Sequence, residues 1–396
     1  MNIEKKVDRI PFNSSLTTGR EIEYIKEAIV ANKLSGNGKF TEKCQTWLET
    51  QTGCHKALLT HSCTAALEMS AILADIEPGD EVIMPSYTFV STANAFVLRG
   101  GVPVFVDIRP DTLNIDETKI EQAITPRTKA IVPVHYGGVA CEMDTIMDIA
   151  RRHNLLVIED AAQGIVAYYK NRPLGSIGHL AALSFHDTKN VISGEGGALL
   201  INDPELIERA EIIWEKGTNR SKFFRGEVDK YSWVDVGSSY LPSEISAAFL
   251  WAQLEVAEVI TEKRLDAWYH YNELFQKLEM LGLLRCPIVP NECQHNAHLY
   301  YLLLKDLKTR TTLIKKLKQQ GIGAVFHYVP LHSSIAGRKF GRVGSEMNVT
   351  NKFAHRLLRL PMFANIEAEQ ISVVTDVIKH FFAVSDRRVL VKKEVA

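Results

Sequence analysis

Short apolar segments alternate with segments of helical periodicity over about the first half of the chain, and this alternation limits the fold more than any other feature. The apolar runs lie at residues 56–60, 81–84, 102–106, 130–134 and 155–158. Each run is apolar at consecutive positions, which is typical of strands buried on both faces of a parallel sheet. We therefore predict an α/β fold whose large domain has a mainly parallel sheet between helices.

The C-terminal third follows a different pattern, which predicts a second domain. Residues 243–278 keep a helical period throughout and predict one long helix that joins the two domains. We place the large α/β domain at residues 1–250 and a smaller α+β domain at residues 251–396. The smaller domain is expected to contain strands near 299–304 and 324–327 and helices near 311–319, 351–358 and 368–382.

Charge and cysteine content argue against several classes of function. The chain has 46 basic and 47 acidic residues, so we expect no nucleic acid and no membrane as a partner. Six cysteines lack the spacing of metal ligands or of a disulfide framework, which indicates reduced thiols and no metal site. We find no export signal and no long apolar span, so a cytoplasmic protein is expected.

One lysine stands in a short polar turn within the stretch 181–201, between two apolar runs that are typical of strands. Lys189 is therefore expected at the mouth of the sheet. A lysine that loses its solvation there has a lowered pKa and can attack a carbonyl, which is what Schiff-base chemistry requires. A solvated surface lysine is the plain alternative.

The residues that follow each apolar run are the next candidates, because open parallel sheets bind ligands beyond the carboxyl ends of their strands. Ser62, Cys63 and Thr64 follow the run at 56–60 and begin a helix, whose free backbone N–H groups favour a phosphate. An ordinary helix cap would use the same residue types. Ser184 ends a later run and is a further candidate for the phosphate.

Three more side chains at strand ends suit a flat, charged ring. Phe89 can stack on such a ring, although core packing explains a lone phenylalanine as well. Asp160 ends a buried strand, where a carboxylate needs a cation such as a protonated pyridine nitrogen, unless it caps a helix. Gln163 follows one helical turn later and can donate to a ring hydroxyl. Together with Lys189 and a phosphate cradle, these groups predict pyridoxal 5′-phosphate as the cofactor.

Four segments, 85–92, 157–163, 184–190 and 195–197, together resemble those of the nucleotide-sugar aminotransferases, which are fold-type I pyridoxal-phosphate enzymes. The resemblance runs from Pro11 to the C-terminal helices. It implies a large-domain sheet of the seven-stranded type and a homodimer in which the two subunits share their active sites. It also implies a role for each candidate: Lys189 as the Schiff-base amine, Asp160 on the pyridine nitrogen, Gln163 on the ring hydroxyl, Phe89 on the ring, and Thr64 and Ser184 on the phosphate.

The chain departs from the family pattern at one point. Many relatives carry a Gly-x-Asn-x-Arg segment whose asparagine reaches the phosphate of the partner subunit. Here Ser239 and Leu241 stand at the asparagine and arginine positions. A serine can still donate a hydrogen bond to phosphate, so Ser239 remains a candidate cofactor ligand.

The resemblance further implies the reaction. An amino group would pass from L-glutamate to the 4-keto carbon of dTDP-4-dehydro-6-deoxyglucose and give dTDP-4-amino-4,6-dideoxygalactose. The diphosphate of such a substrate needs cations, which the basic loop at 216–233 can supply, unless that loop is merely solvated. The expected substrate-binding residues are His186, Arg220, Lys222, Arg225, Lys230, His327 and His332.

Three other functions stay open. The enzyme could act at another keto position or on another nucleotide sugar. The related sugar dehydratases use the same cofactor with a histidine in place of the lysine, and Lys189 argues against that branch. A regulator that only binds the cofactor would usually carry a DNA-binding domain, and no basic helix-turn-helix segment is found at either end of the chain.

Overall fold

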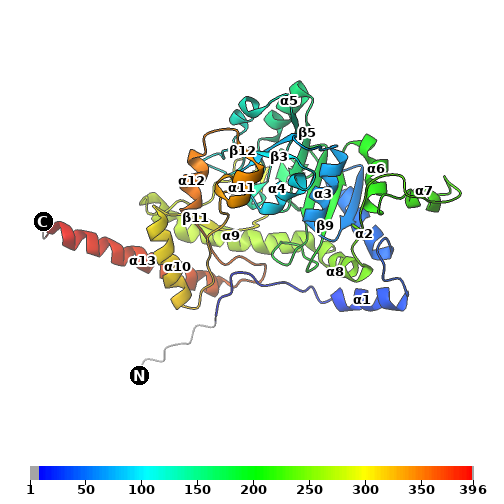
Figure 1. The fold of residues 1–396 in the computed structure, drawn as a ribbon. Coiled ribbons are helices and arrows are strands. Elements are labelled where there is room, and N and C mark those ends of the chain that lie inside the picture. The colour runs from blue at the N-terminus through cyan, green and yellow to red at the C-terminus, as the bar shows by residue number, and fades with distance from the viewer. Residues whose placement is uncertain (1–8, 395–396) are drawn as a thin grey trace.

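The computed structural model describes the backbone of residues 9–394 and the side chains of residues 9–383. Residues 1–8 lie outside this range, so the N-terminal stretch in which we find no export signal is only partly described. Figure 1 shows a sheet enclosed by helices, with α13 (Ala368–Glu394) and the short α7 (Arg220–Phe224) projecting at opposite ends of the molecule. Within the described range, no helix combines the length and the apolar character that crossing a membrane requires.

The main sheet has eight strands and confirms the predicted α/β fold. Strand β9 runs antiparallel to its neighbours β1 and β8, and the remaining pairs are parallel. The carboxyl ends of the parallel strands therefore meet at one edge. The order across the sheet is β1 (Lys56–Thr60), β9 (Gly197–Ile201), β8 (Leu180–Ser184), β5 (Leu156–Asp160), β4 (Thr128–Ile131), β2 (Glu81–Pro85), β3 (Val102–Val106) and β12 (Arg342–Val343).

Both faces of this sheet are buried, as the consecutive apolar positions predict. In β2, Val82 and Met84 belong to the core beneath α3 (Cys63–Leu73), α4 (Val90–Val97) and α6 (Ile207–Trp214). Ile83 points the other way, into the core beneath α5 (Met143–His153). The strands β1, β8 and β9 alternate in the same manner, and their second face is covered by α1 (Glu21–Val30), α2 (Lys39–Thr52) and α8 (Glu244–Leu254).

The C-terminal part has a core of its own around α9, which also includes Ile10 from the other end of the chain. It contains α9 (Ala257–Met280), α10 (Leu307–Gln319), α13 and a two-stranded sheet of β11 (Tyr301–Leu303) and β13 (Leu357–Arg359). The smaller elements of this part are α11 (Ile335–Phe340), α12 (Asn348–Ala354) and β10 (Cys293–Gln294). In a three-stranded sheet, β10 pairs with β6 (Tyr168–Tyr169), which also pairs with β7 (Arg172–Pro173), and these two strands come from the first half of the chain.

Three predictions about elements of this part are wrong. The helix expected over 243–278 is divided at Glu255–Val256, because α8 packs on α1 and α2 whereas α9 packs on α13. Residues 324–327 form a single bridge, between Val325 and Arg359, instead of a strand. The helix expected over 351–358 ends at Ala354, and β13 follows it.

The last strand of the main sheet comes from the C-terminal part, because β12 pairs with β3. Its Arg342 donates from Nε and Nη2 to the buried Glu81 carboxylate, at 2.9 and 2.6 Å, and Arg127 donates to the same carboxylate at 2.8 Å. These hydrogen bonds, with Arg342 as the main partner, lower the pKa of Glu81 to about 2. The division into domains at residue 250 stays a prediction, since both ends of the chain contribute to the C-terminal core and residue 342 contributes to the main sheet.

We expect Glu81→Gln to lower the free energy of unfolding by about 1–3 kcal/mol, because the variant loses a charge-assisted hydrogen-bond network. The folded pKa of Glu81 lies below the ordinary value of 4.5, so the contribution is complete above pH 4.5 and disappears as the pH falls towards 2. Urea denaturation of both proteins at a series of pH values measures the difference.

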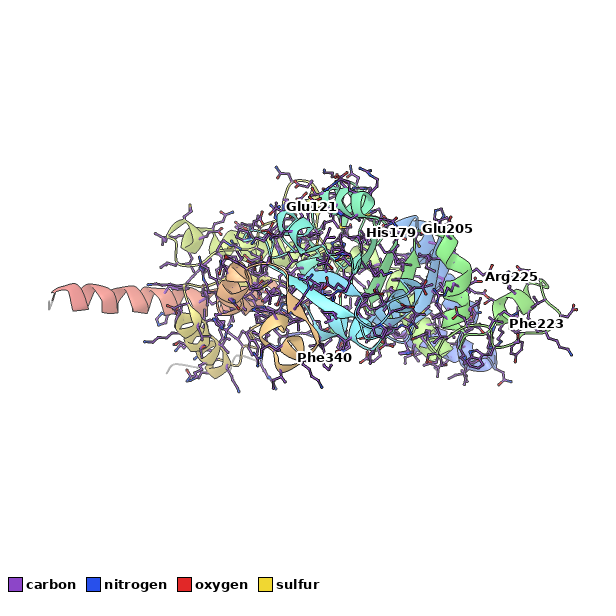
Figure 2. The ribbon with its side chains drawn as sticks, turned by 45° about the horizontal axis from the view of Figure 1, so that its top comes forward. Glu121, His179, Glu205, Phe223, Arg225 and Phe340 are labelled. Carbon is purple, nitrogen blue, oxygen red and sulfur yellow. The ribbon has the colours of Figure 1, made fainter. Side chains whose placement is uncertain are left out.

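Glu121→Gln is the matched control for this test. Glu121, labelled in Figure 2, pairs with Arg152 and His153 on the surface, and hydrogen bonds from Arg152 also lower its pKa to about 2. Pairs that solvent screens contribute little, so this variant should unfold like the wild type. A Glu81→Gln effect that stays constant down to pH 3 would show that the carboxylate charge is not its cause.

Candidate active site

The turn that carries Lys189 joins β8 to β9 at the carboxyl edge of the parallel strands. Its backbone is held by hydrogen bonds from the Asp187 N–H to the Gly194 carbonyl, at 2.8 Å, and from the Lys189 N–H to the His186 carbonyl, at 2.9 Å. Because both flanking strands lie inside the sheet, the position of the lysine is fixed by two neighbouring ladders.

A cavity of about 610 Å³ opens in front of this lysine. Its wall contains most of the residues that sequence reasoning placed around the cofactor, and it also contains two of the expected substrate-binding histidines. The residues of both predicted sets that line it are Ser62, Cys63, Thr64, Phe89, Asp160, Gln163, Ser184, His186, Lys189 and His327.

Asp160 lies at the end of β5 and is almost completely buried, with an exposed fraction of 4%. Its Oδ2 accepts a hydrogen bond from the Thr92 hydroxyl at 2.6 Å, and its Oδ1 accepts one from the Ala162 N–H at 3.2 Å. These neutral donors orient the carboxylate but do not neutralise its charge, so it can still pair with a cation in the cavity.

Gln163 is held by the protein at both ends of its amide. Its Oε1 accepts from the Gly137 N–H at 2.7 Å, and its Nε2 donates to the Tyr328 hydroxyl at 3.0 Å. The Nε2 group has a second hydrogen, which remains for a ligand in the cavity. The amide is therefore fixed in the orientation that suits a donor to a ring hydroxyl.

The first turn of α3 reaches the cavity with Ser62, Cys63 and Thr64. Ser62 caps the helix, since its Oγ accepts from the Ala65 N–H at 3.1 Å, and the N–H groups of Cys63 and Thr64 have no partner within the helix. Ser62 therefore caps the helix and also lines the cavity, so the two interpretations of this residue are compatible. An anion in this position would meet free donors and the positive end of the helix.

Gly197 allows Ser184 to lie beside this helix end. It pairs with Ser184 in β8 and with Thr60 in β1. A Cβ atom at Gly197 would come within 2.4 Å of the Cys63 nitrogen and of the Ser62 carbonyl carbon. Only glycine allows the strand to approach so closely, and this approach brings the Ser184 hydroxyl and the free N–H groups to one cradle.

Phe89 and Lys189 complete the wall. The Phe89 side chain lines the cavity and is 58% exposed, which is unusual for a phenylalanine packed in a core and leaves a ring face for a ligand. Burial lowers the pKa of the Lys189 amine, and the charge of Arg359 acts in the same direction, while Asp160 opposes it. A lowered pKa makes the neutral, nucleophilic amine accessible.

These residues fit pyridoxal phosphate. The helix end and Ser184 offer a phosphate cradle, Phe89 offers a stacking surface, and Asp160 and Gln163 would face the ring nitrogen and the ring hydroxyl. The close approach of β9 to the first turn of α3 depends on Gly197. A phosphate cradle made by both elements requires this approach, whereas a helix cap alone does not.

The comparison with protein families agrees with this geometry. Residues 16–379 match the model of the DegT/DnrJ/EryC1/StrS aminotransferase family. The chain belongs to this family. Its members are sugar aminotransferases that depend on pyridoxal phosphate, and the predicted enzyme class and cofactor are confirmed.

Individual relatives support the same conclusion. The chain is 36% identical to GDP-perosamine synthase from Caulobacter vibrioides, over 82% of this chain and 85% of the relative. It is 34% identical to UDP-4-amino-4-deoxy-L-arabinose–oxoglutarate aminotransferase from Shewanella sediminis, with the same two coverages of 82% and 85%. Among solved structures, the PLP form of the sugar aminotransferase Spr1654 from Streptococcus pneumoniae is similar, with a TM-score of 0.86, 25% identity and coverages of 96% and 99%.

The three histidines expected at the substrate of this aminotransferase lie in different surroundings. His327 lines the cavity, and its Nδ1 lies 2.7 Å from the Tyr136 hydroxyl. His186 also lines it, and its Nδ1 lies 2.9 Å from the Thr188 hydroxyl. His332 lies outside the cavity wall, where its Nδ1 contacts the Ser86 hydroxyl at 2.7 Å.

The expected diphosphate ligands do not line the cavity of their own chain. Arg220 pairs with Glu215, Lys222 with Glu208, and Arg225 with Glu211 and Glu227. Figure 2 shows Phe223 and Arg225 on the projection at one end of the molecule. Lys230 belongs to the same loop, and the exposed Ser239 bridges to Glu215 at its base.

Sequence reasoning missed several residues of the cavity wall. Thr92 orients Asp160, and Tyr328 holds Gln163. His298 lines the same cavity as Lys189, and its Nδ1 lies 3.0 Å from Asn190 Oδ1. Burial lowers the pKa of His298, and the charge of Lys189 acts in the same direction. Arg359 and the N-terminal Phe12 also line the wall. Three of them had a signal, since Thr92 lies in the segment 85–92, Tyr328 follows the expected substrate residue His327, and Phe12 follows Pro11, where the family resemblance begins.

Proposed function

We propose that this aminotransferase transfers the amino group of L-glutamate to the 4-keto carbon of dTDP-4-dehydro-6-deoxyglucose and produces dTDP-4-amino-4,6-dideoxygalactose. The observation that carries the proposal is the meeting of Lys189 and Asp160 in one cavity at the carboxyl edge of the sheet. The family supports amino transfer to a sugar. The choice of nucleotide, sugar and carbon rests on the resemblance of the motifs.

Lys189 has two tasks in this reaction. When bound, pyridoxal phosphate supplies an electron sink that stabilises negative charge at the reacting carbon. Lys189 would hold the cofactor covalently between turnovers, and its amine, once the amine of the donor has displaced it, would move the proton at the α carbon of the donor. The desolvation that lowers the Lys189 pKa favours the neutral amine, which is the form that accepts this proton.

Asp160 and Gln163 orient the cofactor and tune its ring. The Asp160 carboxylate would keep the ring nitrogen protonated, because a cation next to a buried carboxylate is strongly favoured. Thr92 donates to the carboxylate and fixes its direction. Gln163, held by Gly137 and Tyr328, would donate to the ring hydroxyl.

His327, which lines the cavity, would recognise the sugar. Burial lowers its pKa well below the ordinary value, so the ring is neutral. When the Tyr136 hydroxyl donates to Nδ1, the ring proton must lie on Nε2. This tautomer offers an N–H donor, and a sugar hydroxyl or carbonyl oxygen is an acceptor that fits it.

We also propose a homodimer in which the 216–233 loop completes the cavity of a second copy. The loop projects from its own subunit (Figures 1 and 2). It carries Phe224 and Trp233, which are 66% and 81% exposed, beside the basic side chains. Large apolar groups in such exposed positions are typical of interfaces. The cations and Ser239 would then reach the ligand of the partner, as the family pattern implies.

The name of the Shewanella relative, which pairs a 4-amino nucleotide sugar with oxoglutarate, supports the proposed donor and carbon. The names of the relatives contain GDP and UDP, so another nucleotide sugar is the second candidate substrate.

An assay with a panel of keto sugars tests the proposal. The enzyme is incubated with L-glutamate and with dTDP-, UDP- or GDP-linked 4-keto and 3-keto sugars, and the products are identified by mass spectrometry and NMR. We expect the highest kcat/KM with dTDP-4-dehydro-6-deoxyglucose and an axial amine at C4. An equatorial amine, or a clear preference for another nucleotide, would overturn the assignment of the substrate. Absence of amine transfer to every sugar would overturn the proposed function.

A further inference from the structure

A guanidinium that has no acidic partner among the described side chains lies in the wall of the active-site cavity. Arg359 ends β13, and its guanidinium carbon lies 4.8 Å from the centre of the Phe12 ring. Its Nε is buried and has no hydrogen-bond partner among the described residues. Of the cavity-lining residues in the described part of the chain, it is the one arginine.

The groups around Arg359 do not neutralise it. The side chains that act on its charge are the phenols of Tyr87, Tyr136 and Tyr328. Burial raises the pKa of each of these phenols, so all three are uncharged. Arginine keeps its proton in proteins, and a partly buried charge without a counter-charge is unfavourable. An anion bound in the cavity would supply the missing counter-charge.

Arg359 lines the same cavity as Lys189 and His327. Its backbone pairs with that of Val325, two residues before His327, through hydrogen bonds of 2.7 and 3.2 Å. Its charge adds to the effect of burial, which is the main cause of the lowered pKa of Lys189 and of His327. The cofactor phosphate has donors of its own at the cradle. The anion that would pair with Arg359 therefore belongs to a substrate.

Two substrates of the proposed reaction are anionic, and their geometry differs. In an amino acid, a carboxylate is attached directly to the carbon that reacts. In a 4-keto nucleotide sugar, the sugar ring separates the reacting carbon from the diphosphate. A cation close to Lys189 therefore suits the amino acid.

We propose that Arg359 binds the carboxylate of the amino-acid donor and so positions the donor for reaction at Lys189. This inference rests on the proposed function, since it assigns a site for one of its two substrates. Phe12 supports the guanidinium from its flat face, which leaves the edge with its N–H groups for the carboxylate.

Binding of glutarate to the holoenzyme tests the proposal without turnover, because glutarate has the carboxylates of the donor but no amine. Isothermal titration calorimetry is performed with the wild type, Arg359→Gln and Arg359→Lys. We expect the Kd for glutarate to rise by about tenfold or more in Arg359→Gln, as the loss of a charged hydrogen bond predicts. Arg359→Lys should retain part of the affinity, since it keeps the positive charge but loses the paired N–H groups of the planar guanidinium.

Arg310→Gln is the matched control, because Arg310 also has a buried Nε without a partner but lies outside the cavity wall. Its glutarate affinity should equal that of the wild type, and circular dichroism shows that each variant is folded. Titration with dTDP separates the two anionic substrates, and we expect Arg359→Gln to bind dTDP like the wild type. Unchanged binding of glutarate to Arg359→Gln, weakened binding of dTDP, or a wild type that does not bind glutarate would overturn the proposal. None of these outcomes depends on which sugar is the acceptor, so they are distinct from a failure of the proposed function.

Discussion

Replacing Lys189 with alanine is expected to lower turnover by about 10⁴-fold or more, the upper range for a single positioned proton-transfer group. The variant loses both the covalent attachment of the cofactor and the base next to the reacting carbon. The turn is held by backbone hydrogen bonds on either side of the lysine, so the cavity should persist. The rate of amino-sugar formation, measured with saturating cofactor and L-glutamate, gives the effect directly.

Lys129→Ala is the control for this experiment, because Lys129 is an exposed lysine in β4 of the same sheet. It should be as active as the wild type. The yellow colour of the enzyme-bound cofactor provides a second measurement, and Lys189→Ala should lose the absorbance that the wild type loses only on addition of glutamate. Full turnover by Lys189→Ala would refute the role of this residue.

Asp160→Asn should reduce kcat by about 10²–10³-fold, the usual loss when one group that stabilises developing charge is removed. An asparagine keeps the size of the side chain and one oxygen that can accept from Thr92, while the carboxylate charge disappears and the Ala162 N–H loses its acceptor. The ring nitrogen then loses the partner that keeps it protonated. Rates are measured per molecule of bound cofactor, which is determined by absorbance after release in alkali.

The neighbouring acid gives a strict control. Glu159 is fully buried but faces away from the cavity, where its carboxylate accepts from Gly175, Ile177 and Gly178. Glu159→Gln should lower the stability of the fold, because one amide oxygen cannot satisfy these donors. Its kcat per folded molecule should remain that of the wild type. If both variants lost kcat equally, the effect of Asp160→Asn would be structural.

The fold and one side of the site could be predicted because each depends on local pattern. A buried parallel sheet requires consecutive apolar residues, and its topology brings the ends of separate strands together. Asp160 and Ser184 are more than twenty residues apart in the chain, yet β5 and β8 are neighbours. The positions of the strand ends in the sequence therefore predict that these side chains lie together at one edge of the sheet.

The residues of the opposite wall of the cavity follow no such pattern in the sequence. Tyr328 follows a segment that forms only one bridge, and Arg359 ends a three-residue strand that overlaps the end of the helix expected over 351–358. Phe12 comes from the other end of the chain. Their meeting depends on how the C-terminal core packs against the sheet, which is a property of tertiary contacts rather than of spacing. The break between α8 and α9 was hidden for the same reason, since the helical period continues through it.

The pairing of β12 with β3 restricts how the active site can open. In many two-domain enzymes, substrates enter when one domain swings away from the other about a hinge. Here the C-terminal part is attached to the far edge of the main sheet by two paired residues and by the clamp of Arg342 on Glu81. A swing large enough to separate Arg359 and His327 from Lys189 must first break that pairing. We therefore expect substrates to exchange through the mouth of the cavity without a swing of the C-terminal part.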